Sequence, residues 1–288
     1  ILSHQKIINC KVFKKLTLGI DPKVFTSAQI KKFFLKNNKI KEIPFNLIDK
    51  IYKNSLSKTK PFFSLNKEIV GESHLKKIIR VSKFLKKNKS DYLFITAPEN
   101  VAWLLNIRGF DNPNSPIPNC RLLINDKGKF YIIADKTKLS NLFKEKKIKK
   151  NQVIDEKNFE ETINKLNRGK IIIDSKTCSL FFENLFKKNF KILDKKDPIY
   201  LFKAIKNKNE IKHMINAHIL DGVALTRFLY WIKISNKKKI TEFDAQNKLE
   251  SFRKNSKQYL FPSFNTIAGT GENAAIVHYR ETKKNTKV

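Results

Sequence analysis

The sequence predicts α/β domains with a mixed sheet, followed by the start of an α+β unit. Short β-rich runs alternate with helical segments between residues 71 and 195, a pattern typical of layered α/β domains. From residue 197 onward, two helical segments precede a separate β-rich stretch, as in α+β units. The chain has 288 residues, which is long enough for two or more hydrophobic cores.

Residues 1–66 are expected to form the C-terminal part of a first α/β domain. Residues 27–35 keep helical spacing, with Ser27 as the expected N-cap. A further apolar segment covers residues 46–52, and the polar stretch 54–61 predicts a linker. We therefore expect the beginning of this domain to be missing from the sequence.

Residues 71–195 are expected to form a second α/β domain. Ser73 can cap a helix with an inner face made of Leu75, Ile78, Ile79, Ser82 and Leu85. A buried strand is expected at 92–96, and Pro98 can open the next helix at its first turn. The remaining runs predict strands at 121–124, 130–134, 152–154, 170–174 and 190–193, with helices at 159–166 and 179–186.

Residues 197–288 predict a third unit. A long amphipathic helix is expected over 209–233, with one stripe made of Ile211, Met214, Ile215, His218, Leu225, Leu229 and Ile232. Thr241 with Asp244 forms a capping box for a second helix. The stretch 261–279 is then expected to form two paired strands, joined by a loop in which Gly269 and Gly271 take positive φ angles.

His278 would lie at the exit of that strand pair, where its side chain can face a cleft. The glycine loop also matches a dinucleotide-binding pattern, but β-branched residues follow where that motif requires a helix.

Composition excludes several functional classes. The formal net charge is +34, but the lysines are spread through every segment, so we expect no specific nucleic-acid partner. Cys10, Cys120 and Cys178 lack the spacing of a zinc site or a disulfide framework, which favours reduced thiols that act as packing residues in a cytoplasmic protein. No apolar run approaches the ~20 residues that span a bilayer, so we expect no membrane partner.

Few residues could carry chemistry. His213 and His218 lie five apart on a predicted helix, which does not stack them as metal ligands on one face. Trp103 and Arg108 could project from a loop toward a cleft. They fit equally well as a core residue and a surface ion-pair partner.

Three collinear stretches carry a family resemblance. Residues 97–109 with Asn114-Ser115-Pro116, residues 197–225, and residues 263–279 ending in Ala275-Ile276-Val277-His278-Tyr279 resemble the three-domain Xaa-Pro aminopeptidases (aminopeptidase P). The resemblance covers nearly the whole chain in order. It implies creatinase-like α/β domains before a catalytic domain of the pita-bread fold, with boundaries 1–66, 71–195 and 197–288.

The resemblance also implies a function. Such enzymes are metallopeptidases that remove the N-terminal residue from peptides with proline in second position, and they work as homodimers. A hydroxide between two divalent metal ions, usually Mn²⁺, attacks the scissile carbonyl. His278 matches a histidine that donates a hydrogen bond to the substrate or the tetrahedral intermediate. Trp103 and Arg108 match a segment that approaches the active site and can bind substrate.

The sequence departs from the family at the metal ligands. Two aspartates, a histidine and two glutamates are expected after the His-Tyr pair, hence downstream of Val288, so this chain is expected to hold no metal ligand. We therefore expect a fragment, cut at both ends, that is inactive alone. The alternatives are a non-catalytic relative that binds peptides or proteins, and another pita-bread enzyme of the prolidase or creatinase type.

Overall fold

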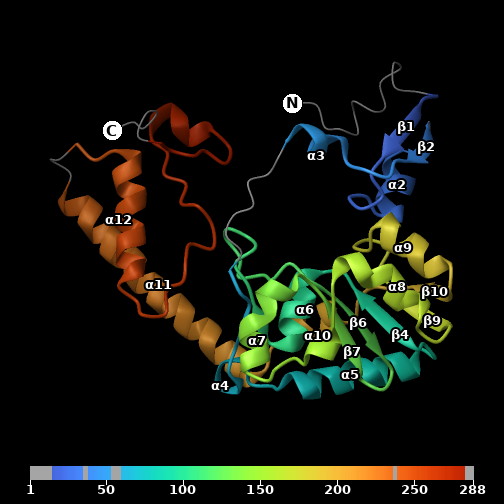
Figure 1. Cartoon of the computed structure of the whole chain (residues 1–288). Helices are drawn as coiled ribbons and strands as arrows, with labels where there is room; N and C mark the ends of the chain where they lie inside the picture. The colour runs from blue at the N-terminus through green and yellow to red at the C-terminus, as the bar shows by residue number, and fades with distance from the viewer. Residues whose placement is uncertain (1–14, 35–37, 53–59, 236–238, 283–288) are drawn as a thin grey trace. The chain divides into compact units, whose positions relative to one another are not determined.

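The computed structural model describes residues 15–34, 38–52, 60–235 and 239–282 (Figure 1). These residues fall into two compact units. We call the first the sheet unit; it takes residues from 1–67, 72–112 and 117–205. The second, the helical unit, takes residues from 68–71, 113–116 and 206–288. The prediction for Cys10 lies outside the described residues.

A six-stranded mixed sheet forms the centre of the sheet unit, which confirms the predicted fold class. Its order is β10-β9-β4-β6-β7-β8. Strands β10, β9 and β4 are parallel, β6 runs antiparallel to both β4 and β7, and β8 is parallel to β7. The strands are β4 (Tyr92–Ile95), β6 (Arg121–Asn125), β7 (Phe130–Ile133), β8 (Val153–Ile154), β9 (Gly169–Ile173) and β10 (Phe190–Asp194).

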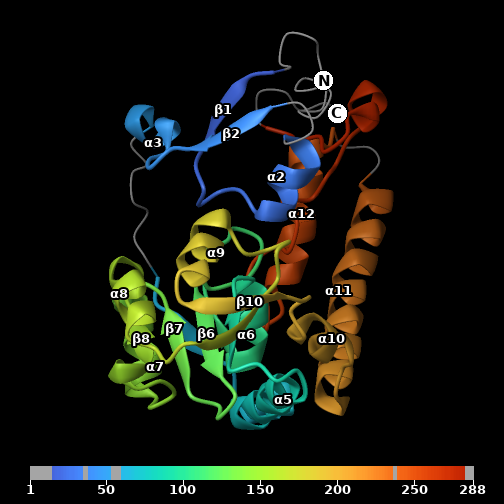
Figure 2. The ribbon, with the colours of Figure 1, turned by 90° about the vertical axis from the view of Figure 1, so that its right-hand side faces the viewer.

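Helices cover both faces of this sheet (Figures 1 and 2). One face packs against α5 (His74–Lys87), α6 (Pro98–Leu105), α7 (Ser140–Lys144) and α10 (Ile199–Ala204). The other packs against α8 (Phe159–Asn164) and α9 (Leu180–Lys187). Successive strand residues point to opposite faces, so Leu93 and Ile95 of β4 enter the first core and Phe94 enters the second.

Phenylalanine rings fill the second core. The ring of Phe94 lies with its centroid 4.9 Å from Phe186, 5.2 Å from Phe182 and 5.5 Å from Phe159. All four side chains are buried, and the contacts range from tilted to edge-on, the geometries that aromatic pairs prefer.

The predicted starts of α5 and α6 are confirmed, but the predicted buried face of α5 is only partly correct. Ser73 caps α5 and Pro98 opens α6, as expected. Ile78 and Leu85 of α5 are buried, but Leu75 is 60% exposed and Ile79 is 53% exposed, so these two predictions are wrong. The buried stripe follows 78, 81 and 85, and the two exposed residues fall on its flanks.

Smaller elements complete the sheet unit. β1 (Thr17–Ile20) pairs in parallel with β2 (Lys39–Glu42), and β3 (Phe63–Ser64) pairs antiparallel with β5 (Ile107–Arg108). The remaining short helices are α2 (Ser27–Phe33), α3 (Leu47–Ile51), and three 3₁₀ turns, η2 (Lys136–Leu139), η3 (Lys150–Gln152) and η4 (Glu156–Asn158). The cap of α2 is Thr26 rather than Ser27, because Thr26 and Gln29 form a reciprocal capping box.

Two long helices dominate the helical unit. α11 (Lys208–Ile234) and α12 (Glu242–Lys254) lie side by side, and Thr241 and Asp244 form the predicted capping box (Figures 1 and 2). Asn207 caps α11 and donates to the carbonyl of Val70, which belongs to α4 (Lys67–Val70).

The predicted apolar stripe of α11 lies mostly at the surface. Ala224 is the one buried residue of α11 among those described. The residues expected on the inner stripe are exposed, namely Ile211, Met214, Ile215, Leu225, Leu229 and Ile232. Within the helical unit, α12 and the segment 68–71 cover only part of this helix. No helix in the described ranges has the length and apolar character that a membrane span requires.

Gly71 allows the backbone of the segment 68–71 to lie close to the start of α11. Its φ is +71°, and a Cβ placed there would lie 2.9 Å from the Cβ of Asn209. Any other residue would meet both backbone strain and this contact.

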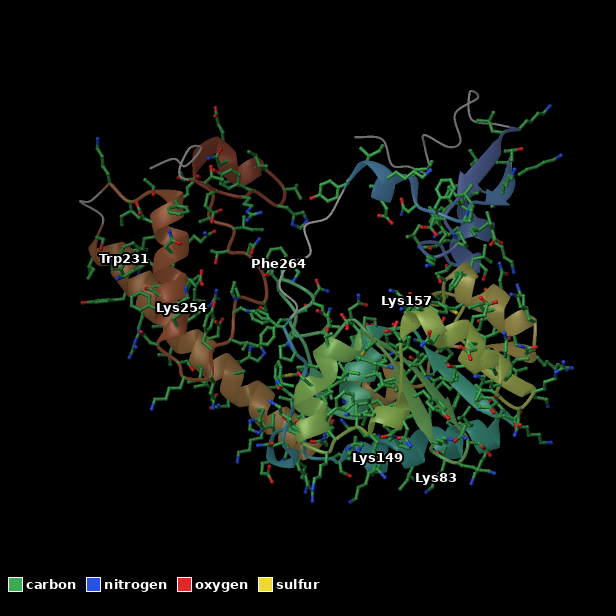
Figure 3. The ribbon with its side chains drawn as sticks, in the orientation of Figure 1. Lys83, Lys149, Lys157, Trp231, Lys254 and Phe264 are labelled. Atoms are coloured by element: carbon green, nitrogen blue, oxygen red, sulfur yellow. The ribbon has the colours of Figure 1, made fainter. Side chains whose placement is uncertain are left out.

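The side chains outside the cores are strongly basic. Exposed lysines occur on both units, among them Lys83, Lys149 and Lys157 in the sheet unit and Lys254 in the helical unit (Figure 3). Cys120 and Cys178 are buried free thiols, and burial raises the pKa of Cys178 to about 12. Both therefore act as packing residues, as expected.

The aromatic core gives a stability prediction. Phe94→Ala should lower the free energy of unfolding by about 3–5 kcal/mol, because it leaves a cavity among Phe159, Phe182 and Phe186. Urea unfolding followed by far-ultraviolet circular dichroism measures the change. Phe45→Ala is the matched control: Phe45 is 45% exposed, so its loss should stay within about 0.5 kcal/mol. Equal losses in the two variants would contradict the prediction.

Candidate functional site

The glycine-containing stretch 261–279 forms a loop with one 3₁₀ turn, η5 (Gly271–Ala275). The predicted strand pair is therefore wrong. Backbone N–H groups bond three residues back, Ile276 to Asn273 and Tyr279 to Ile276, each at 3.1 Å. The segment thus satisfies part of its backbone locally, and the described part of the helical unit contains no strand to pair with it.

Only one of the two loop glycines has the expected conformation. Gly271 has φ +53°, whereas Gly269 does not take a positive φ.

His278 lies near the end of this loop with an exposed imidazole. Its φ is 55°, in the left-handed region that residues other than glycine seldom adopt. The ring centroid lies 6.2 Å from that of Phe264, which is also exposed (Figure 3). His278 thus stands in a loop and not at the exit of a strand pair, and its side chain lines neither of the two pockets described below.

A buried carboxylate holds the loop against α12. Glu242 Oε1 accepts hydrogen bonds from the Thr270 N–H at 2.6 Å and from Asn273 Nδ2 at 3.1 Å. Its Oε2 accepts from the Tyr279 hydroxyl at 2.8 Å and from Asn273 Nδ2 at 3.0 Å. Glu242 is 5% exposed and Tyr279 is 7% exposed. We call this arrangement of Glu242, Thr270, Asn273 and Tyr279 the Glu242 cluster.

The cluster also fixes the protonation of its phenol. Burial raises the pKa of Tyr279 to about 12, and the hydrogen bond to the Glu242 carboxylate adds to this effect. Tyr279 therefore stays a neutral hydrogen-bond donor throughout the physiological range. Sequence reasoning missed Glu242 because its partners lie 28 to 37 residues away along the chain.

A cavity of about 520 Å³ lies between the loop and the two helices of the helical unit. Its lining is mostly apolar, which suits an apolar group better than a charged one. The lining comprises Phe228 and Ile232 of α11, Ile240, Thr241, Glu242, Ala245 and Leu249 at α12, and residues 266–270 of the loop.

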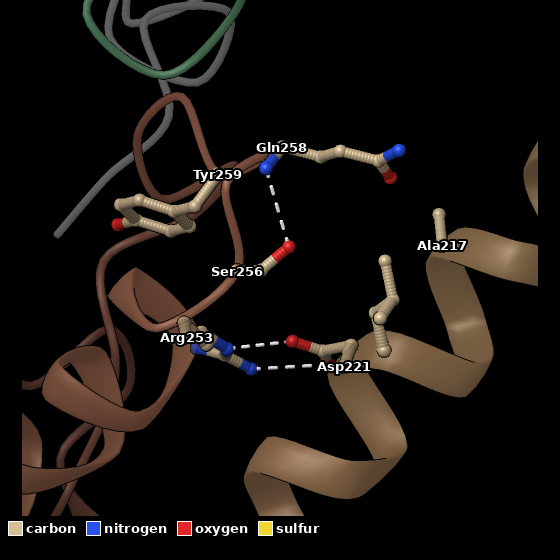
Figure 4. A pocket seen from close by; sticks show the side chains of 7 residues that line it. Ala217, Asp221, Arg253, Ser256, Gln258 and Tyr259 are labelled. Carbon is tan, nitrogen blue, oxygen red and sulfur yellow. Dashed lines mark hydrogen bonds and ion pairs between the residues drawn. The ribbon is translucent and has the colours of Figure 1, made fainter.

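A second pocket, of about 210 Å³, lies beside Asp221 of α11 (Figure 4). Arg253 donates from Nε to Oδ1 of Asp221 at 2.6 Å and from Nη2 to Oδ2 at 3.2 Å. The guanidinium is thus engaged by a carboxylate within the chain. This pocket consequently offers little to an anionic ligand.

Trp103 and Arg108 lie in regular elements of the sheet unit, and not on a loop as one interpretation expected. Trp103 is in α6, half-buried against the first core. Arg108 is in β5, and its Nη1 donates to the Ile107 carbonyl at 2.9 Å and to the Ala102 carbonyl at 3.3 Å. The two residues belong to the sheet unit, whereas His278 belongs to the helical unit.

A buried lysine supports Trp103. Lys77 is 1% exposed, and its Nζ donates to the Trp103 carbonyl at 2.9 Å and to Asn106 Oδ1 at 2.7 Å. The ammonium also lies 3.9 Å from the centroid of the indole ring, a cation–π distance. No local pattern distinguishes Lys77 from the other lysines of α5, so sequence reasoning missed it.

The described residues do not fit a metal centre. They contain no group of three or more His, Cys, Asp or Glu side chains that could hold a metal ion. His213 Nε2 lies 3.4 Å from the Glu68 carbonyl oxygen, and His218 is exposed on α11. We therefore assign no chemical step to a metal held by these residues.

Family models match two adjacent segments of the chain. The model of the creatinase/prolidase N-terminal domain matches residues 53–210. The model of metallopeptidase family M24 matches residues 212–288.

Curated relatives align over most of the chain. "Xaa-Pro aminopeptidase 1" of Dictyostelium discoideum is 30% identical over 93% of this chain and 45% of its own length. "Xaa-Pro aminopeptidase ApepP" of Drosophila melanogaster is also 30% identical, over 93% of this chain and 45% of its own length. The chain therefore spans less than half of the relatives that it matches.

A solved structure shows the same fold. The crystal structure of X-prolyl aminopeptidase from Caenorhabditis elegans superposes with a TM-score of 0.85 at 22% identity. The match covers 99% of this chain and 49% of that one. That protein is described as a cytosolic enzyme with a di-nuclear active site.

The support of Trp103 gives a second prediction. Lys77→Met should lower the free energy of unfolding by about 1–3 kcal/mol, because it removes the donor of the buried hydrogen bond to Asn106 Oδ1 and of the bond to the Trp103 carbonyl. Urea unfolding followed by Trp103 emission in a Trp231→Phe background measures this. Lys83→Met, the same change at an exposed position of α5, should have little effect. A Lys77→Met variant as stable as the Lys83→Met control would show the contacts to be unimportant.

Proposed function

The chain belongs to the creatinase/prolidase N-terminal domain family, and on that premise we propose that the whole protein is a Xaa-Pro aminopeptidase. It would remove the N-terminal residue from peptides with proline in second position. The observation that carries the proposal is the alignment over 93% of the chain with relatives named as Xaa-Pro aminopeptidases. The match of the metallopeptidase family M24 model over residues 212–288 supports a metallopeptidase segment in the last part of the chain.

We propose roles for three side chains. His278 donates a hydrogen bond to the substrate or to the oxyanion of the tetrahedral intermediate. Its exposed imidazole supports this role, because the ring is accessible from solvent. Trp103 and Arg108 bind substrate from the sheet unit, and both are partly exposed.

We propose that the whole protein uses two divalent metal ions, with Mn²⁺ as the metal. The M24 match supports metal dependence. When bound, the metals would supply an activated hydroxide. Their ligands are expected outside the described residues, which hold no candidate group.

The proposal extends to organisation and location. Residues 1–66 and 71–195 would be the two creatinase-like domains, and residues 197–288 the beginning of the pita-bread domain. The protein would act as a homodimer in the cytoplasm, with neither nucleic acid nor a membrane as its specific partner. The cytosolic description of the Caenorhabditis elegans enzyme supports the location.

The metal proposal predicts a difference between two polypeptides. The whole protein should hydrolyse a Xaa-Pro peptide in the presence of Mn²⁺ and lose that activity with a chelator. Residues 1–288 alone should show no hydrolysis, because their described part holds no metal-ligand group. A Mn²⁺-dependent rate from residues 1–288 would refute the second expectation. A whole protein that binds such peptides without cleaving them would favour the non-catalytic alternative.

The role of His278 predicts a kinetic effect. His278→Ala in the whole protein should lower kcat/KM on a Xaa-Pro peptide by about 10²- to 10³-fold, the usual loss for one oxyanion donor. Steady-state kinetics at saturating Mn²⁺ measure this. His218→Ala, which removes an exposed histidine of α11, is the matched control and should leave kcat/KM unchanged. Equal kinetics for the two variants would remove His278 from the site.

A further inference from the structure

We propose that Glu242 is a positioning residue for His278. Its buried carboxylate ties the loop to α12 and so fixes the backbone from which the imidazole extends. This inference rests on the proposed function, because it gives Glu242 its effect through the role of His278.

The Glu242 carboxylate forms hydrogen bonds at both ends of the loop segment 270–279. The carboxylate receives a backbone N–H at Thr270, a side-chain amide at Asn273 and a hydroxyl at Tyr279. Asn273 Nδ2 also lies 3.0 Å from the Tyr279 hydroxyl oxygen, so the partners contact each other. A single side chain of α12 therefore holds the segment from Thr270 to Tyr279.

His278 needs such an anchor. Its left-handed φ of 55° is unfavourable for a residue with a Cβ, and such a conformation persists only where the surroundings impose it. Tyr279, the next residue, is buried and bonded to Glu242. That bond therefore holds the backbone directly beside His278.

The other end of the anchor is rigid. Glu242 is the first residue of α12, directly after the Thr241 cap, and the capping box with Asp244 fixes this turn. Buried hydrogen bonds to a charged acceptor are stronger than neutral ones, so the cluster is well suited to hold a geometry. A small displacement of a substrate-binding group can lower a rate by up to about 10²-fold.

A double-mutant cycle in the whole protein tests the inference. Glu242→Gln should lower kcat/KM on a Xaa-Pro peptide by about tenfold or more, because the neutral amide weakens the bonds to the loop. In a His278→Ala background the same change should have almost no further effect, since the residue through which it acts is gone. Glu250→Gln, two turns further along α12, is the matched control and should leave kcat/KM unchanged.

A second readout reports on the loop itself. In Glu242→Gln, amide hydrogen exchange should become faster at residues 266–279 and stay unchanged in α11. If Glu242→Gln does not fold, Tyr279→Phe and Asn273→Ala each remove part of the cluster and keep the carboxylate, and the same cycle is run with them.

The outcomes separate the inference from the proposed function. If His278→Ala has full activity, the role of His278 fails and the inference fails with it. If His278→Ala loses activity but Glu242→Gln has the same effect in both backgrounds, the positioning role is overturned and the proposed function stands. Unchanged hydrogen exchange in the loop would also overturn the positioning role.

Discussion

Strand β4 is the element on which the sheet unit depends. It is central in the sheet, and its alternate side chains enter two different cores, Leu93 and Ile95 on one face and Phe94 on the other. Both helical layers therefore take their position from one four-residue strand. β4 is parallel to β9 and antiparallel to β6, so it borders the one strand of this sheet that runs against its neighbours.

Local signals allowed much of the fold to be predicted. Caps such as Ser73 and Thr241 act within three residues, and within a helix Pro98 is tolerated only in the first turn, so helix starts could be identified from the sequence. Strand pairing in the loop stretch 261–279 could not be judged in the same way, because a strand depends on a distant partner. Bonds between residues three apart formed there instead.

The residues that support the candidate site escaped prediction for a related reason. Lys77 and Glu242 carry charges, and charged residues are expected at the surface unless their partners are known. Their partners lie 26 to 37 residues away and include backbone groups, which no sequence pattern shows. The position of His278 after a glycine loop drew attention to it in the sequence, but only the family resemblance gave it a role. In the structure its surroundings are a loop and one aromatic neighbour.

The hydrogen bonds at the start of α11 join segments that are synthesised at different times. Asn207 and Asn209 donate to the carbonyls of Val70 and Glu68, so the helix begins on a segment 137 to 141 residues earlier in the chain. At a synthesis rate of about 5–20 residues per second, that segment leaves the ribosome roughly 7 to 28 seconds before the helix that binds it. The strands and helices of the sheet unit are completed within this interval. The carbonyls of residues 68 and 70 therefore remain exposed on the nascent chain, available to water or to a chaperone, until α11 arrives.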